Sequence, residues 1–119
     1  MDNKEFGKQL EDRTKKFAIQ IIKLSKSISA TTENNVIKNQ LTKSGTSVGA
    51  NYREANRSRS KADFTNRIKI CESEASEVVY WLEIIEELKL DISGNIQVII
   101  LEANELLALF TSIATKLKL

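Results

Sequence analysis

The chain has 119 residues, 41% of them hydrophobic and 29% charged, with no proline and a formal net charge of +2. This composition predicts one soluble domain over residues 1–119 and excludes disordered, collagen-like and disulfide-rich classes. The charge is unevenly placed, because residues 1–69 carry a net +8 and residues 70–119 a net −6. The asymmetry indicates a basic face for polyanions or attraction between opposite faces, unless these charges only solvate helix surfaces.

Targeting and membrane signals are missing from the sequence. A single cysteine excludes an internal disulfide, and the first residues lack the apolar run of a signal peptide. No apolar run approaches the roughly 20 residues of a membrane span. We therefore expect a reducing compartment and no membrane partner.

The first predicted element is an amphipathic helix over about residues 3–29, opened by a capping box of Asp2 and Glu5. Arg13 occupies a gap in its apolar stripe, and we expect an edge position rather than a buried ion pair. The stripe falls at helical spacing on one face: Phe6, Leu10, Phe17, Ile21, Leu24 and Ile28.

A second helix follows a turn at residues 29–32, where a threonine is the expected N-cap, and runs to about residue 57. Gly45 and Gly49 lie one turn apart and favour close packing of helices over membrane dimerisation. An apolar series on this helix comprises Ile37, Leu41, Val48 and Ala55. A polar series runs beside it at the same spacing: Gln40, Ser44, Ser47 and Asn51.

This polar series has three interpretations: a structural hydrogen-bond network, a ligand site or a solvated face. Its members adjoin core positions, and buried polar groups need partners, so a network is favoured. Asn51 could fix the register between helices, as one buried asparagine does in coiled coils.

The third helix starts near residue 61, after a capping box of Ser60 and Asp63, and its heptad seam has no interruption: Phe64, Ile68, Cys71, Ala75, Val78, Leu82 and Ile85. The fourth helix follows a turn at residues 89–94, capped by Asp91 or Ser93. Its expected core face is Ile96, Ile100, Ala103, Leu107, Phe110, Ile113 and Leu117. Four long helices with short connections predict an all-α, up-down-up-down four-helix bundle.

Further apolar residues lie outside these seams, which indicates a wide core or an oligomer interface. Trp81 and Ile84 are the candidate interface residues, and the protomer is expected to form a cyclic homo-oligomer. The other residues outside the seams are Val79, Ile99, Leu106 and Leu109.

Enzymatic chemistry finds little support. Histidine, the commonest general base and metal ligand, is absent. Cys71 lies in the middle of a seam and is expected to be a buried hydrophobe rather than a nucleophile. Glu74 and Glu77 share a helix face, but pairing with Arg53, Arg67 or Asn51 suits them better than metal binding. We expect no enzyme, no cofactor and no metal.

Basic residues gather around the turn between the second and third helices, at Arg53, Arg57, Arg59, Lys61 and Arg67. Arg53 and Arg57 are one helical turn apart. Arginines on a rigid corner suit bidentate contacts to phosphate, so this cluster is the candidate nucleic-acid surface.

Several segments together resemble a bacterial family, the four-helix proteins of the 23S ribosomal RNA intervening-sequence type. They are residues 40–44, 46–55, 62–64, 74–77 and 80–83, with Ser-x-x-Ser-Val-x-x-Asn, then Glu-Ala-x-Glu, then Tyr-Trp-Leu. The accessory protein of diversity-generating retroelements is similar but more distant, and it is basic, whereas this chain is nearly neutral.

The resemblance implies a four-helix protomer assembled as a homopentamer in the bacterial cytoplasm, with no established enzymatic activity. The retroelement relative binds nucleic acid and a reverse transcriptase. The family motif marks Ser44, Ser47, Asn51, Glu54, Glu74 and Glu77 in this chain, which supports one network between the second and third helices.

The leading hypothesis is a non-enzymatic oligomer that binds structured RNA or other nucleic acid through the basic corner. The rival is a protein–protein scaffold without nucleic-acid affinity, in which residues such as Trp81 and Ile84 dock another protein or other copies of the chain.

Overall fold

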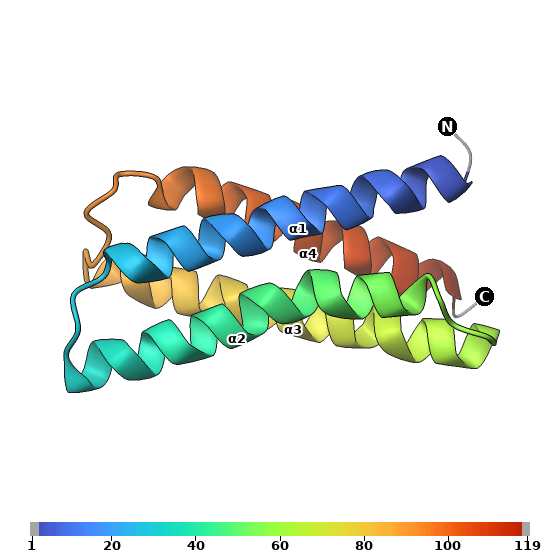
Figure 1. Ribbon diagram of the computed structural model, residues 1–119, viewed down its shortest axis with the longest axis horizontal. Helices are drawn as coiled ribbons and strands as arrows, with labels where there is room; N and C mark the ends of the chain where they lie inside the picture. The colour runs from blue at the N-terminus through green and yellow to red at the C-terminus, as the bar shows by residue number, and fades with distance from the viewer. Residues whose placement is uncertain (1–2, 118–119) are drawn as a thin grey trace.

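The computed structural model describes residues 3–117, which form four α-helices and no strand, as predicted. They are α1 (Asn3–Ser27), α2 (Thr32–Ala55), α3 (Lys61–Glu87) and α4 (Ile96–Leu117). The helices lie lengthwise in a body of 44 × 25 × 20 Å. In Figure 1 the α2–α3 turn lies at one end, and the α1–α2 and α3–α4 turns lie at the other.

Two helix starts have the predicted caps. The Thr31 hydroxyl accepts a hydrogen bond from the Asn34 N–H at 3.0 Å, and the Ser60 hydroxyl accepts one from the Asp63 N–H at 3.1 Å. Such caps satisfy N–H groups that have no partner within the helix. Asp2, the expected cap of the first helix, lies outside the described residues.

Both candidates for the cap of α4 take part in its start. The Asp91 carboxylate accepts from the N–H groups of Ser93 and Ile96, both at 2.9 Å, and the Ser93 hydroxyl accepts from the Asn95 N–H. Partial burial acts to raise the pKa of Asp91, but these hydrogen bonds outweigh it and lower that pKa below its ordinary value. The ionised carboxylate therefore stabilises this turn.

Replacing Asp91 with alanine should lower the free energy of unfolding by about 1 kcal/mol, the usual cost of a lost cap. The pKa is lower in the folded chain, so the stabilisation is present above the ordinary aspartate pKa and is lost as pH falls through the folded value. Urea unfolding of both proteins at neutral pH and near pH 2 measures this. If the difference in the free energy of unfolding between the parent and Asp91→Ala proteins is the same at both pH values, the assignment is contradicted.

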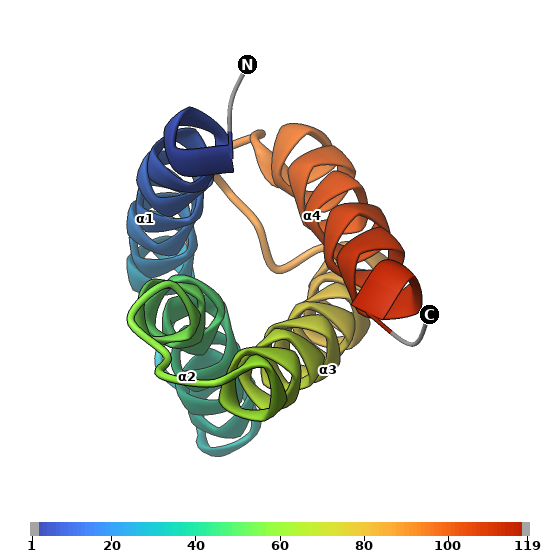
Figure 2. The same cartoon turned by 90° about the vertical axis from the view of Figure 1, so that its right-hand side faces the viewer.

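The helices contact their sequence neighbours most. Figure 2, a view along the bundle, shows them at four corners in chain order. The α1–α2, α2–α3 and α3–α4 pairs are extensively packed, and α1 and α4 are the least packed of the adjacent pairs. The backbones of diagonal helices do not approach closely, although the ring of Tyr52 in α2 meets that of Phe110 in α4 edge to face at a centroid distance of 5.6 Å. The two inner helices in chain order, α2 and α3, are thus each packed against two neighbours.

The glycines of α2 account for its close approach to α1. A Cβ added at Gly45 would lie 2.7 Å from Ile21 Cγ2, and one at Gly49 would lie 3.0 Å from Thr14 Oγ1. Real Cβ atoms essentially never have a contact as short as 2.7 Å, so only glycine fits at position 45 without a shift of its neighbours. The interpretation of these glycines as a close-packing device agrees with this geometry.

The α1 stripe differs from the prediction at two positions. Phe6 is 38% exposed, while Thr14 is fully buried and donates its hydroxyl to the Leu10 carbonyl at 2.9 Å. Arg13 lies at the edge and is also an ion-pair partner: Nη2 contacts Glu102 Oε1 at 2.7 Å and Glu105 Oε2 at 2.9 Å. The hydrogen bond to Glu102 raises the pKa of Arg13 above its ordinary value.

The predicted core face of α4 was partly wrong. Ile99 and Leu106, placed outside the seam, are buried, whereas Ile100 and Leu107 are only partly buried. The helix is apolar on several sides, so the sequence pattern could not choose its rotation. The pairing of Glu102 with Arg13 across the α1–α4 groove is consistent with the rotation observed.

By length and composition alone α4 could cross a membrane, because its mean hydropathy reaches 1.6. The core helix of a soluble bundle passes the same test. In the structure α4 packs against α3, and two of its glutamates pair with Arg13 of α1.

Candidate nucleic-acid interface

A hollow lies where α2 turns into α3. Three of the predicted arginines line it, together with residues that can donate or accept hydrogen bonds. Its lining is Glu54, Arg57, Ser58, Arg59, Asp63, Asn66, Arg67 and Ile70. The structure thus brings Arg57, Arg59 and Arg67 together from the turn and from the first turns of α3.

Local hydrogen bonds shape this corner. The N–H of Arg57 donates to the Glu54 carbonyl at 3.1 Å, and the N–H of Ser58 donates to the Ala55 carbonyl at 3.0 Å. α2 therefore ends at Ala55, two residues earlier than predicted, and α3 begins after Ser60. The start of α3 adds the partial positive charge of a helix N-terminus to that of the arginines.

Arg67 joins the corner to α2. Its Nη1 donates to Asn51 Oδ1 at 2.9 Å, and Asn51 Nδ2 donates to the Ser47 carbonyl at 2.9 Å. The amide of Asn51 is thereby fixed in orientation, and the guanidinium of Arg67, which lines the hollow, is tied to α2. The predicted link between Asn51 and the third helix exists, with Arg67 as its partner.

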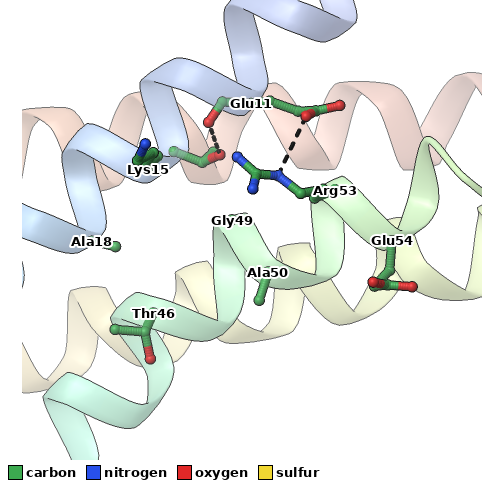
Figure 3. A pocket seen from close by; sticks show the side chains of 9 residues that line it. Glu11, Lys15, Ala18, Thr46, Gly49, Ala50, Arg53 and Glu54 are labelled. Atoms are coloured by element: carbon green, nitrogen blue, oxygen red, sulfur yellow. Dashed lines mark hydrogen bonds and ion pairs between the residues drawn. The ribbon is translucent and has the colours of Figure 1, made fainter.

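Arg53 lies apart from the other arginines. It faces the α1–α2 groove, where its Nε is 3.4 Å from Glu11 Oε1, as Figure 3 shows. Lys15, Ala18 and Gly49 also line this groove. Lys61, the first residue of α3, is exposed and does not line the corner hollow. The predicted cluster of five cations is therefore divided.

The polar series is satisfied mostly within α2. Ser44 is fully buried and donates its hydroxyl to the Gln40 carbonyl at 2.9 Å. The Ser47 side chain lies near Glu74 of α3 and acts on its pKa. Burial raises the pKa of Glu74, and the neighbouring Glu77 raises it further, while Ser47 and Lys43 act to lower it. Ser47–Glu74 and Asn51–Arg67 are thus two separate pairs between α2 and α3.

The remaining members of the predicted network have other contacts. Glu77 accepts a long hydrogen bond of 3.5 Å from Trp81 Nε1 on its own helix. Glu54 lies between the corner hollow and the α1–α2 groove, and it lines both. Trp81 and Ile84, the candidate interface residues, are partly buried against the core.

Four residues of the two hollows were not predicted as site residues: Ser58, Asp63, Asn66 and Glu11. Asp63, Asn66 and Ile70 recur at spacings of three and four on α3, so a helical-wheel comparison with Arg67 would have placed them on one face. No comparable signal identifies Glu11, since its contact with Arg53 joins residues on different helices.

Cys71 occupies the predicted buried position in the α3 seam. Its Sγ donates to the Val48 carbonyl at 3.5 Å, and burial raises its pKa to about 12. The thiol is therefore protonated at neutral pH, and a protonated thiol is a poor nucleophile.

The fold defines a four-helix protein with an arginine-lined corner. The family model of the 23S rRNA-intervening sequence protein matches residues 9–112, and the chain belongs to this family. A solved structure from Bacteroides thetaiotaomicron, described as a protein with unknown function from the S23 ribosomal protein family, is similar with 35% identity and a TM-score of 0.79. The match covers 87% of this chain and 96% of that one. A search among curated proteins gave no match.

Proposed function

We propose that this chain is a non-enzymatic, cytoplasmic protein that binds structured RNA or other nucleic acid through the α2–α3 corner. The observation that carries the proposal is the convergence of Arg57, Arg59 and Arg67 on one hollow. Guanidinium groups bind phosphate through two parallel hydrogen bonds, which makes such a cluster a suitable phosphate site. The family name points in the same direction.

The charge state of the corner supports this assignment. The ion pairs among residues 3–117 join Arg13 to Glu102 and Glu105, and Arg53 to Glu11. Arg57, Arg59 and Arg67 take part in none of them, although Glu54 and Asp63 share the hollow. These arginines are therefore available to neutralise phosphate charge, which is the main source of affinity for nucleic acids.

The protomer is further proposed to be an up-down-up-down unit of a cyclic homo-oligomer, with a homopentamer as the expected state. A ring repeats the arginine corner at each protomer and would bind an RNA at several points at once. Repeated attachment raises overall affinity without new contacts, provided that the sites can be reached together.

Binding to a labelled structured RNA should be strong at low salt and should fall steeply as salt rises, because phosphate neutralisation releases counterions. Fluorescence anisotropy from low to physiological salt measures this, and light scattering on the same samples gives the mass of the assembly. A ring without RNA affinity even at low salt would refute the nucleic-acid role.

A second candidate function is a protein–protein scaffold, which exposed apolar side chains favour. Tyr80 is 57% exposed, and its ring meets that of Trp81 edge to face at a centroid distance of 5.0 Å. This function predicts assembly that is insensitive to salt and no retention of RNA.

A further inference from the structure

Two helices at diagonal corners of the bundle carry opposite charges. Residues 13–27 of α1 include five basic and no acidic residues, and residues 70–87 of α3 include six glutamates and no basic residue. Figure 2 shows α1 and α3 across the bundle from each other, and their backbones do not approach closely. Their charges cannot neutralise one another within one protomer.

These charges lie on the solvent side of each helix. Lys23 and Lys26 of α1 are exposed, and so are Glu83 and Glu87 of α3. None of the ion pairs found in residues 3–117 includes any of them. Each outer face is therefore left with a net charge that a surface of opposite sign would complement.

Each outer face also exposes an apolar side chain among its charges. Ile19 of α1 is 44% exposed and Tyr80 of α3 is 57% exposed. Ile19 lies eight residues before the end of α1, and Tyr80 lies seven residues before the end of α3. Both helices end at the same end of the bundle (Figure 1). At about 1.5 Å per residue, the two side chains stand at nearly the same level along the bundle.

We infer that the outer face of α1 in one copy docks against the outer face of α3 in a second copy. A sideways displacement of the second copy, without a shift along the bundle, brings Ile19 to the level of Tyr80. It also brings Lys23 to the level of Glu83, and Lys26 to within about one residue of the level of Glu87. α1 and α3 run in the same direction, so the docked helices are parallel. This inference rests on the proposed self-association and assigns the two surfaces that carry it.

The docking has a polarity, because each copy uses two different faces. One copy offers α1 to a neighbour and α3 to the next, which is a heterologous contact. Such contacts repeat into a closed ring when the rotation between copies closes. The burial of Ile19 and Tyr80 supplies attraction, while the charges fix orientation and disfavour contacts between two α1 or two α3 faces.

Two variants with reversed charges test this contact. The acidic-α1 variant carries Lys23→Glu and Lys26→Glu, and the basic-α3 variant carries Glu83→Lys and Glu87→Lys. All four side chains are exposed, so the fold should persist, which circular dichroism checks. The exchanged variant carries all four substitutions and keeps the net charge of +2 of the parent chain.

Sedimentation velocity across a concentration series should show weaker assembly for each variant with two substitutions, by roughly tenfold or more in the dissociation constant. A mixture of the acidic-α1 and basic-α3 variants should assemble again, because each supplies the charge that the other lacks. The exchanged variant should also recover assembly, since its acidic α1 faces a basic α3 in every copy.

Three results would contradict the inference. Variants with two substitutions that assemble as the parent does would place the interface elsewhere, and so would a folded exchanged variant that fails to recover. Lys4→Glu with Lys116→Glu makes the same change in net charge as the acidic-α1 variant, at exposed positions on the first turn of α1 and on α4. Equal weakening by that pair would reduce the effect to overall charge. A parent chain that stays monomeric at every concentration would instead refute the proposed self-association itself.

Discussion

Replacing Arg57 and Arg59 with alanine together should lower the affinity for structured RNA on the order of 100-fold at low salt, because two charge-assisted hydrogen-bonding groups are lost. The slope of log affinity against log salt should become shallower by about two, as expected for two lost phosphate contacts. Fluorescence anisotropy at several salt concentrations measures both quantities. The fold should be unaffected, since both side chains are exposed.

A control with two lysine substitutions separates the contribution of the arginine corner to RNA binding from the effect of overall positive charge. Lys4→Ala with Lys43→Ala removes two positive charges from exposed positions on α1 and α2 that do not line the corner hollow. It should change RNA affinity far less than the arginine pair does. An equal loss in both pairs would mean that RNA senses only the overall charge, and an unchanged affinity of the arginine pair would exclude the corner.

Replacing Gly45 with alanine should destabilise the bundle by about 1–2 kcal/mol, although alanine is the better helix former. The new Cβ would lie 2.7 Å from Cγ2 and 3.0 Å from Cγ1 of Ile21, which is completely buried. Ile21 is enclosed in the core, so either its side chain or the spacing between α1 and α2 must shift. Urea unfolding followed by circular dichroism measures the loss, and Gly45→Val should cost more.

Gly7→Ala is the control for this substitution. The nearest atom to a Cβ at Gly7 is Asn56 Nδ2 at 3.4 Å, which is an ordinary contact with a side chain. The change should be neutral or stabilising, because it supplies helix propensity without a clash. Equal stability of the Gly45→Ala and parent proteins would show that the α1–α2 spacing is not limited by this contact.

Local signals predicted the helix starts and the α3 seam. The caps at Thr31 and Ser60 depend on residues within three positions, and the seam repeats without interruption, so both could be recognised from sequence. The rotation of α4 about its own axis could not be predicted from the sequence, because Ile99 and Ile100 are equally apolar. Contacts with residues distant in sequence define this rotation. One is the hydrogen bond from Arg13 to Glu102, which lies 89 positions away.

The arginine corner could be predicted only in part, because some of its contacts are local in sequence and others are not. Arg57, Arg59 and Arg67 are close in sequence, and a tight turn keeps them together. Arg53 and Arg57 were expected on one helix face, but α2 ends at Ala55, so the spacing of four residues no longer sets a common direction. Arg53 instead turns toward Glu11, a contact between helices that no local pattern signals.

The sparse contact between α1 and α4 makes stability uneven along the chain. α1 is held mainly by α2, and α4 mainly by α3, so either terminal helix can detach while the other three remain packed. Detachment of an inner helix would break two extensive contacts at once. The α2–α3 hairpin is therefore the most persistent unit of the molecule, and its turn keeps the arginine corner in place during local opening of α1 or α4.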